Sequence, residues 1–361
     1  MKKKTKIFLF NPYPAVGGVD TTIKRFLPFL KKKFDIEYIS LTKKNCILEK
    51  NVKNTTINTT STFRSFFKIY KIYKNDKHPK KIFFSFQYFA NVWSIIFIKL
   101  LLRGKLLIYE VNHLDELIYY NSIKDFIKKK IIKLAVKFLY KYPDIVSTNS
   151  RESTNDLKKF VKRDVYTIPN PCFSRKITKK NKYKSLKNIN ILNISRFEHQ
   201  KDHLTLLKAI NHSAIKNKIN LFLVGYGKNY NKIKSYVDKN RIKVKIFLKN
   251  TNLKKFYLNA DLYICTSLYE GLPTTVIEAA SYSIPIISSN FKSGAKEILK
   301  NGKQGTIFKK GDYKKLAKIL DNFYYNPQPF FKKEYLCRKN ISFYSVKNSK
   351  LELKKIINKL N

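Results

Sequence analysis

The sequence predicts an α/β protein with two Rossmann-like domains, each built on a parallel sheet that helices cover on both faces. Two observations lead to this expectation. Short apolar runs rich in strand-forming residues alternate with longer stretches of helical periodicity along the whole chain, and this alternation is typical of parallel sheets. The chain also has 361 residues, which is too long for one ordinary core and suits two domains.

The first domain is expected over residues 1–172. Its first strand is predicted at Lys6–Phe10, and the turn that follows contains Gly17 and Gly18, before a helix with apolar residues at helical spacing. In a βαβ unit this turn lies where such sheets bind ligands. The pair lacks the full G-x-G-x-x-G pattern, so a plain tight turn is an equal alternative. The further strands are predicted at Asp35–Ser40, Lys81–Phe86, Lys105–Val111, Asp144–Asn149 and Asp164–Pro169.

Three expected helices of the first domain mix aromatic, aliphatic and lysine residues: Phe63–Lys74, Val92–Leu102 and Ile123–Tyr140. Basic amphipathic helices of this kind resemble interfacial membrane binders. The alternative for each helix is that one face packs on the sheet while the lysines are solvated. The longest apolar patch, Val92–Leu102, is interrupted by Lys99 and is too short to span a bilayer.

A polar, basic stretch without periodicity predicts a linker over residues 173–187. The second domain is expected over residues 188–340, and residues 341–361 are expected to form a final helix, with a return to the first domain as one option. The strands predicted for the second domain are Ile189–Ser195, Leu221–Val224, Val244–Leu248, Leu262–Thr266, Ile284–Ser288 and Gly305–Phe308.

Composition excludes a disordered protein, because 43% of the residues are hydrophobic and 14% are aromatic. The formal net charge is +51, so the surface is expected to attract phosphate-rich partners, either nucleic acid or anionic lipid. The apolar run at the start of the chain is too short for a signal peptide. The cysteines form no C-x-x-C pair, which argues against a zinc site or a disulfide framework and suits a reducing cytoplasm; they are Cys46, Cys172, Cys265 and Cys337.

The stretch Thr266–Ser288 is predicted to run from the end of a strand through a loop into a helix and on to another strand. Unpaired N–H groups and the positive end of the helix dipole make such a loop an anion site. Glu270 in the loop and Glu278 in the first helical turn then suit a ligand that carries both phosphate and hydroxyl groups. Two alternatives stay open: Thr275 and Glu278 can form a capping box, and Glu270 can be a solvated loop acid.

A second anion site is indicated in the segment that joins Ser195 to the next helix. Asp202 is a natural N-cap, so Lys201 lies beside the positive pole of that helix, where a cation is repelled unless an anion is bound. With Arg196 nearby, the pair is interpreted as a phosphate clamp, against the alternative of two ordinary surface residues. The turn that contains Gly225 is interpreted as a tight strand-to-helix turn beside the ligand.

Together these pieces resemble the family-4 retaining glycosyltransferases of the GT-B fold, in which two Rossmann-like domains face a central cleft. The resemblance rests on Gly17-Gly18 after the first predicted strand and on four further stretches: ISRFEHQKDHLTLLKAI, VGYG, NADLYICTSLYEGLPTTVIEAASYSIPIISS, and SGAKEIL with NGKQGTIF. It is strong from about Asn188 to Asp321 and patchy in the first domain.

The resemblance implies roles for individual residues. The catalytic set that it implies is Glu270, His113, Arg196 and Lys201. In it, Arg196 and Lys201 neutralise the donor diphosphate, Glu270 faces the transferred sugar, and His113, which follows a predicted strand, lies next to that sugar. Glu278 accepts hydrogen bonds from the ribose. The donor-binding set is Gly17, Gly18, Arg196, Lys201, Gly225, Leu248, Lys249, Glu270, Gly271, Leu272, Pro273, Thr274, Thr275 and Glu278.

Two places in the sequence depart from the family pattern. Lys249 and Asn250 stand where a glycine is usual, which bears on the choice of base, and Asp202 stands where glycine is common, which bears on the helix cap. No Asp-x-Asp element follows a predicted strand, so no metal site is expected and protein cations are expected to replace a metal.

The function expected from the resemblance is retaining transfer of a hexose or N-acetylhexosamine from a nucleotide sugar, with UDP as the expected nucleotide and no further cofactor. The expected acceptor is a lipid-linked glycan or a surface polysaccharide such as lipopolysaccharide or capsule, at the anionic inner face of the plasma membrane. The alternatives are a non-catalytic GT-B scaffold and a basic nucleic-acid-binding protein. Nucleic-acid binding is disfavoured because the charge is spread evenly and no recognition motif is present.

Overall fold

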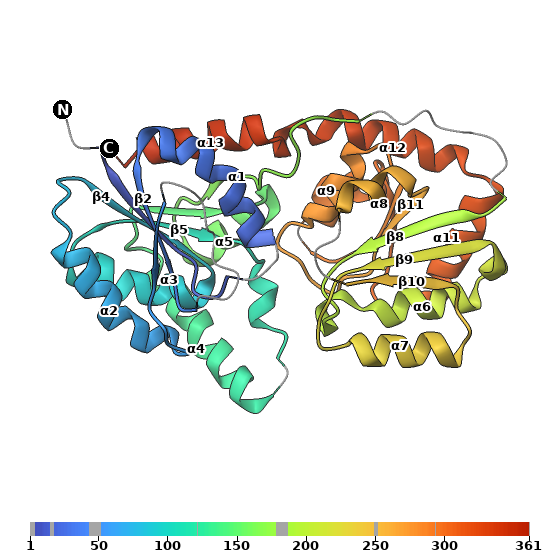
Figure 1. Cartoon of the computed structure of the whole chain (residues 1–361), viewed down its shortest axis with the longest axis horizontal. Helices are drawn as coiled ribbons and strands as arrows, with labels where there is room; N and C mark the ends of the chain where they lie inside the picture. The colour runs from blue at the N-terminus through green and yellow to red at the C-terminus, as the bar shows by residue number, and fades with distance from the viewer. Residues whose placement is uncertain are drawn as a thin grey trace. The chain divides into compact units, whose positions relative to one another are not determined.

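A computed structural model describes residues 4–14, 18–42, 52–120, 122–177, 187–248, 252–292 and 294–360. The chain divides into two compact units (Figure 1). The first contains Met1–Pro171 together with Val346–Asn361, and the second contains Cys172–Ser345.

The first unit is built on a sheet whose described residues form seven strands in the order β3-β2-β1-β4-β5-β6-β7. All pairings are parallel; Phe8 of β1, for example, pairs with Glu37 of β2 on one side and with Phe83 of β4 on the other. The strands are β1 (Lys6–Phe10), β2 (Asp35–Ser40), β3 (Lys53–Thr56), β4 (Lys81–Phe86), β5 (Lys105–Glu110), β6 (Ile145–Thr148) and β7 (Tyr166–Thr167).

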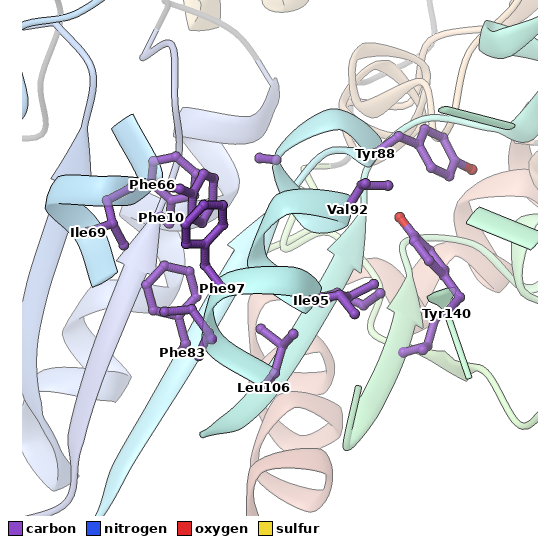
Figure 2. Packing of buried hydrophobic residues seen from close by; sticks show 14 of the residues in the cluster. Phe10, Phe66, Ile69, Phe83, Tyr88, Val92, Ile95, Phe97, Leu106 and Tyr140 are labelled. Atoms are coloured by element: carbon purple, nitrogen blue, oxygen red, sulfur yellow. The ribbon is translucent and has the colours of Figure 1, made fainter. Parts of the chain in front are cut away.

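Helices cover both faces of this sheet. One face packs against α1 (Gly18–Lys33) and α13 (Val346–Asn358). The other face packs against α2 (Thr62–Asn75), α3 (Tyr88–Ser94), the π-helix Ile95–Leu101, α4 (Ile123–Leu139) and α5 (Arg151–Val161). Figure 2 shows part of this second core, where Phe10 and Phe83 of the sheet meet Phe66 of α2 and Phe97 of the π-helix.

The described residues of the second unit form six parallel strands in the order β10-β9-β8-β11-β12-β13. The strands are β8 (Ile189–Ile194), β9 (Ile219–Val224), β10 (Val244–Phe247), β11 (Leu262–Cys265), β12 (Ile286–Ser289) and β13 (Thr306–Phe308). One core contains residues of α6 (His203–His212), α7 (Tyr230–Lys239) and α11 (Tyr313–Tyr325). The other contains residues of α8 (Leu253–Asn259), α9 (Thr274–Ser281), α10 (Ala295–Leu299) and α12 (Gln328–Asn340).

In both sheets the strand order reverses beside the first strand, between β1 and β4 and between β8 and β11. At such a switch point the two following loops leave in opposite directions, which opens a crevice at the carboxyl ends of the strands where ligands bind. The site-forming loops of the second unit are therefore those that follow β8 and β11.

The predicted α/β architecture of two parallel sheets is confirmed, and most predicted strands appear within two residues of their predicted limits. Strand β3 was not predicted, because its sequence KNTT is polar and its residues lie at the sheet edge. The predicted helix Val92–Leu102 is present as α3 continued by the π-helix. Residues Ile341–Tyr344 form a 3₁₀ turn before α13 begins. Among the described residues, none of the helices is both long and apolar enough to cross a bilayer.

Candidate functional site

The loops that follow β8 and β11 lie side by side and are joined by hydrogen bonds. The backbone N–H of Leu268 donates to the carbonyl of Gln200 at 2.8 Å, and the Gln200 side chain donates to the carbonyl of Tyr269 at 2.7 Å. The Thr266 hydroxyl donates to the carbonyl of Lys201 at 2.9 Å. The structure thus brings the two predicted anion-binding segments together at the switch point of the sheet.

Lys201 and Glu270 form an ion pair across these loops. Their side chains are only 14% and 12% exposed, and the Ser267 hydroxyl also donates to Glu270 Oε1 at 2.8 Å. The interpretation of Glu270 as a solvated loop acid is therefore wrong. Because the Lys201 ammonium neutralises this carboxylate, Glu270 can accept hydroxyl hydrogen bonds without repelling a nearby phosphate.

Asp202 ends the short 3₁₀ turn His199–Lys201 and caps α6, as predicted. Its carboxylate accepts from the Thr205 N–H at 3.4 Å and from the Thr205 hydroxyl at 2.6 Å. Its backbone is left-handed, with φ 44°, a conformation that favours glycine. This geometry accounts for a glycine being common at this position in the family that the sequence resembles.

Arg196 is exposed, and its guanidinium makes no hydrogen bond or ion pair with the parts of the chain that the structure describes. The turn at Gly225 supports the backbone at this point. A Cβ at Gly225 would lie 1.9 Å from the carbonyl oxygen of Ser195, so only glycine allows this approach, and the Phe197 N–H donates to the carbonyl of Tyr226 at 2.8 Å. The guanidinium of Arg196 is thus exposed on a loop whose backbone is held in place by these contacts.

His203, at the start of α6, also helps to hold the loop after β8 in place. Its Nε2 lies 2.9 Å from the Ser195 hydroxyl. Burial, together with the nearby positive charge of Lys201, lowers the pKa of His203 to about 3. The imidazole is therefore neutral at physiological pH and serves as a hydrogen-bond partner for Ser195.

Glu278 lies in the second turn of α9, not in the first turn as predicted, because the helix begins at Thr274 after Pro273. The capping-box interpretation is wrong as well. Thr275 lies inside the helix, and its hydroxyl accepts a hydrogen bond from Tyr263 at 2.7 Å. Glu278 instead accepts a hydrogen bond from the Tyr257 hydroxyl at 2.9 Å, so its carboxylate is positioned by a side chain from α8.

The segment between Glu270 and α9 brings backbone donors to the same place. Gly271, Leu272 and Pro273 are buried, whereas Thr274 and Thr275 are half-buried at the start of the helix, where the first N–H groups have no partner inside the helix. Gly294, at φ 76°, packs closely on Pro273 from behind. The loop is therefore fixed before any ligand arrives.

Of the remaining predicted residues of the second unit, Leu248 directly follows β10. Leu248 is half exposed, and Lys249 lies outside the described residues. In the first unit Gly17 is likewise outside them. Gly18 begins α1, and a Cβ added there would meet nothing within 4 Å, so the backbone at this point is open to a ligand.

His113 belongs to the first unit and follows β5. It is 3% exposed, with Nε2 2.9 Å from Asp156 Oδ2 and Nδ1 accepting from the Asp115 N–H at 3.1 Å. Burial lowers the pKa of His113, but the carboxylates of Asp115 and Asp156 outweigh it and leave the pKa raised. Both ring nitrogens are thus engaged by the protein itself.

A cavity of about 430 Å³ lies in the first unit, at the carboxyl edge of its sheet. Its wall combines aromatic, amide, acidic and basic side chains. They come from the loops after β1, β3, β4 and β5, from the first residues of α2 and α3, and from α4. Among them are Tyr13, Gln87, Glu116, Asp125 and Lys128. A polar ligand of modest size fits this lining.

Sequence reasoning missed three residues that position the site, namely Gln200, Ser267 and Tyr257. Gln200 and Ser267 lie inside the quoted motifs, Gln200 next to Lys201 and Ser267 three residues before Glu270, and this nearness to a site residue is a usable signal. Tyr257 precedes Glu278 by 21 residues, and nothing in the sequence links the two. Over the described ranges, no group of three or more His, Cys, Asp or Glu residues is arranged to hold a metal ion.

Comparison with known proteins extends these observations. Residues 174–340 match the family described as "Glycosyl transferases group 1". An uncharacterized glycosyltransferase of Methanocaldococcus jannaschii is 30% identical over 192 residues, which are 49% of this chain and 47% of that protein. The Campylobacter jejuni protein named "GalNAc-alpha-(1->4)-GalNAc-alpha-(1->3)-diNAcBac-PP-undecaprenol alpha-1,4-N-acetyl-D-galactosaminyltransferase" is 29% identical over 204 residues, 56% of each chain. The chain spans about half the length of the curated relatives it matches.

Among solved structures, Anabaena HepE in complex with UDP and glucose aligns with a TM-score of 0.78, covering 98% of this chain and 99% of that one at 14% identity. At such an identity the likeness concerns the fold. It agrees with the two parallel sheets of seven and six strands described above. The chain therefore has the GT-B fold, and residues 174–340 within its second unit are similar to group 1 glycosyl transferases.

Proposed function

We propose that the chain is a retaining, metal-independent glycosyltransferase that transfers a hexose or N-acetylhexosamine from a nucleotide sugar, with UDP as the nucleotide and no further cofactor. The observation that carries the proposal is the meeting of two loops at the switch point between β8 and β11. One loop supplies Arg196 and Lys201, and the other supplies Glu270 and the N-terminus of α9. Cations and hydroxyl acceptors are thereby combined, as a sugar diphosphate requires.

In this proposal the second unit stabilises the leaving group. Negative charge grows on the diphosphate as the bond to the sugar breaks, and Arg196, Lys201 and the N–H groups of α9 are placed to stabilise it. Lys201 has three donors, so it can keep its contact with Glu270 and still reach a phosphate oxygen. Glu270 orients a sugar hydroxyl, and Glu278, held by Tyr257, accepts from the ribose.

Retention of configuration follows if the acceptor attacks on the face from which the diphosphate leaves. The bond from the acceptor oxygen to the anomeric carbon forms as the bond to the diphosphate breaks. The leaving phosphate oxygen takes the acceptor proton, so no protein base is needed. In this scheme Glu270 orients and does not attack.

The acceptor that we propose is a lipid-linked glycan or a bacterial surface polysaccharide, used at the cytoplasmic face of the plasma membrane. The name of the Campylobacter relative gives a PP-undecaprenol-linked glycan, which supports a lipid-linked acceptor here. The cavity of the first unit, with its mixed polar lining, is the place we assign to the acceptor. The crystallised HepE complex contains UDP, which supports the choice of nucleotide.

Calorimetric titration with UDP, GDP and ADP, without added metal, tests the proposal. We expect saturable binding of UDP and a loss of roughly tenfold to a hundredfold in affinity for Lys201→Ala, because a charge-assisted hydrogen bond contributes about 1.5–3 kcal/mol. Lys208→Ala is the matched control, since Lys208 is an exposed lysine of α6 outside the site. A folded protein that binds none of the three nucleotides would instead support a scaffold or nucleic-acid-binding role.

A further inference from the structure

Helix α4 exposes a continuous apolar stripe. Its members are Ile123, Ile127, Ile131, Leu134 and Phe138, each between 52% and 79% exposed. At 100° per residue these spacings place all five side chains within an arc of roughly 80°. The stripe is therefore one face of the helix, not a scatter of single exposed residues.

Lysines border this stripe on both sides. Lys124 and Lys128 follow one edge, and Lys130, Lys133 and Lys137 follow the other. The only acid in the helix, Asp125, lies on the opposite face and pairs with Lys129 at 3.1 Å. The solvent-facing half of α4 is thus apolar in the middle and positive at its margins.

The opposite face of α4 fixes this orientation. Ile132 and Val136 are buried in the core of the first unit, and so is Tyr140 just after the helix. Tyr140 lies near Tyr88 of α3 in Figure 2. Because three residues at helical spacing anchor the inner face, the stripe cannot turn inward without unpacking the core.

We propose that the exposed face of α4 docks on the surface of an anionic lipid bilayer. A helix with an apolar stripe and flanking lysines lies in the plane of such a surface, with the stripe at the acyl boundary and the lysines among the head groups. Lysine stems are long enough to keep their charges at that level. Of the three helices that the sequence named, α4 exposes five large apolar side chains, whereas α2 exposes Phe63 and Phe67 and the π-helix exposes Leu100 and Leu101.

Other occupants fit this face less well. A second copy of the chain would bring a further lysine border and a further net charge of +51 against the first. A nucleic acid would meet a stripe in which four of the five side chains are aliphatic, and aliphatic side chains neither stack on bases nor form hydrogen bonds. An anionic bilayer complements both the stripe and its margins.

The residues at the ends of α4 extend the same surface. Ile118 and Tyr120 precede the helix and Tyr142 follows it, and all three are exposed. Tyrosine suits a membrane interface because its ring is apolar and its hydroxyl is polar. Asp125 and Lys129 on the inner side, together with Lys128 at the margin of the stripe, also line the cavity, so docking would hold that cavity at the lipid surface. The link to a lipid-linked acceptor rests on the proposed function, whereas docking itself does not.

Vesicle co-sedimentation of the full chain tests the docking. The vesicles are phosphatidylcholine alone and an equal mixture of phosphatidylcholine and phosphatidylglycerol. We expect binding to the mixed vesicles and a loss of roughly tenfold or more in the triple variant Ile127→Gln, Ile131→Gln, Leu134→Gln. The control variant Tyr335→Gln, Leu351→Gln removes exposed apolar side chains from α12 and α13 and should bind like the wild type.

A pair of charge variants separates docking from general attraction. Lys124→Gln, Lys130→Gln, Lys137→Gln should weaken binding to mixed vesicles severalfold. Lys232→Gln, Lys234→Gln, Lys239→Gln removes the same charge from the exposed side of α7 in the second unit and should have little effect. Equal losses in both variants would overturn the proposal, since general attraction by a basic protein would then explain the binding.

Two further readouts keep the result interpretable. Circular dichroism checks that each variant is folded, which is expected because the substituted side chains are exposed. UDP titration of the apolar-stripe variant should match the wild type, so failure of docking and failure of the donor site are distinguishable. An absence of vesicle binding by the wild type, or a dimer that the triple glutamine variant dissociates, would also overturn the proposal.

Discussion

At the scale of single residues, Asp202 combines a side-chain cap with a left-handed backbone. Replacement by alanine removes the cap and keeps the strained conformation, so we expect Asp202→Ala to lower the free energy of unfolding by about 1–2 kcal/mol. Asp202→Gly also loses the cap but relaxes the backbone, and it should cost only a few tenths of a kcal/mol. Urea denaturation of both variants measures the difference.

Asp312 provides the matched control, because it caps α11 by accepting from the Lys315 N–H at 2.9 Å with an ordinary φ of −80°. The difference in the free energy of unfolding between the alanine and the glycine variant should be larger at position 202 than at position 312. Equal differences at the two positions would show that the left-handed conformation carries no cost.

Glu110 is a second informative residue, because it is buried at the end of β5. Burial raises the pKa of its carboxyl to about 8, against the opposing effect of hydrogen bonds from Tyr140 and Asn91. Between the ordinary pKa of 4.5 and this value, the folded state holds a proton that the unfolded state has released. The stability that this group contributes is therefore complete below the window and is lost as the pH rises through it.

We expect wild-type stability to fall relative to Glu110→Gln by up to about 1.4 kcal/mol per pH unit between about pH 5 and about pH 8. Chemical denaturation of both proteins across this range measures the trend. All other titratable groups are the same in the two proteins, so their contributions cancel in the difference between the two free energies of unfolding. Parallel stability profiles would mean that Glu110 is ionised in the folded protein.

At the scale of elements, the loop after β8 depends on the close approach of Gly225 to Ser195. A methyl group at Gly225 would press on a backbone carbonyl, so Gly225→Ala must move the segment that holds Arg196. We expect a loss of about 1–3 kcal/mol in stability, as for other overpacked sites, together with weaker UDP binding. Gly18→Ala is the control for stability, since a methyl group there meets no neighbour; a similar fall in its melting temperature would contradict the argument.

The elements also show how far the sequence predicts the structure. Central strands such as β1 and β4 are continuous apolar runs because both of their faces are buried, and such runs are easily found. The edge strand β3 has no such pattern. The pattern at Thr275 and Glu278 was misleading, because tertiary contacts with Tyr263 and Tyr257 occupy both side chains. Short sequence motifs predicted the loops that form the site. The hydrogen bonds from Tyr257 and Tyr263 could not be predicted in this way, because they join different secondary-structure elements.

At the scale of the whole molecule, α13 belongs to the first unit although it follows the second in the chain. Leu353 of α13 is buried with α1 and the sheet of the first unit, and Leu320 of α11 is equally buried in the core of the second. Each leucine should therefore stabilise the unit in which it is packed, by about 2–5 kcal/mol on truncation to alanine. Substitutions of Leu320 and Leu353 therefore test the stability of two different cores.

Hydrogen exchange followed by mass spectrometry measures the two effects separately. Leu353→Ala should increase exchange in β1, β4 and β5 and leave β8 and β11 protected, because opening of the first core exposes only the strands packed in it. Leu320→Ala should give the reverse pattern, and since the two substitutions remove the same atoms, each is the control for the other. Faster exchange in β8 and β11 alone on Leu353→Ala would mean that α13 stabilises the second unit instead.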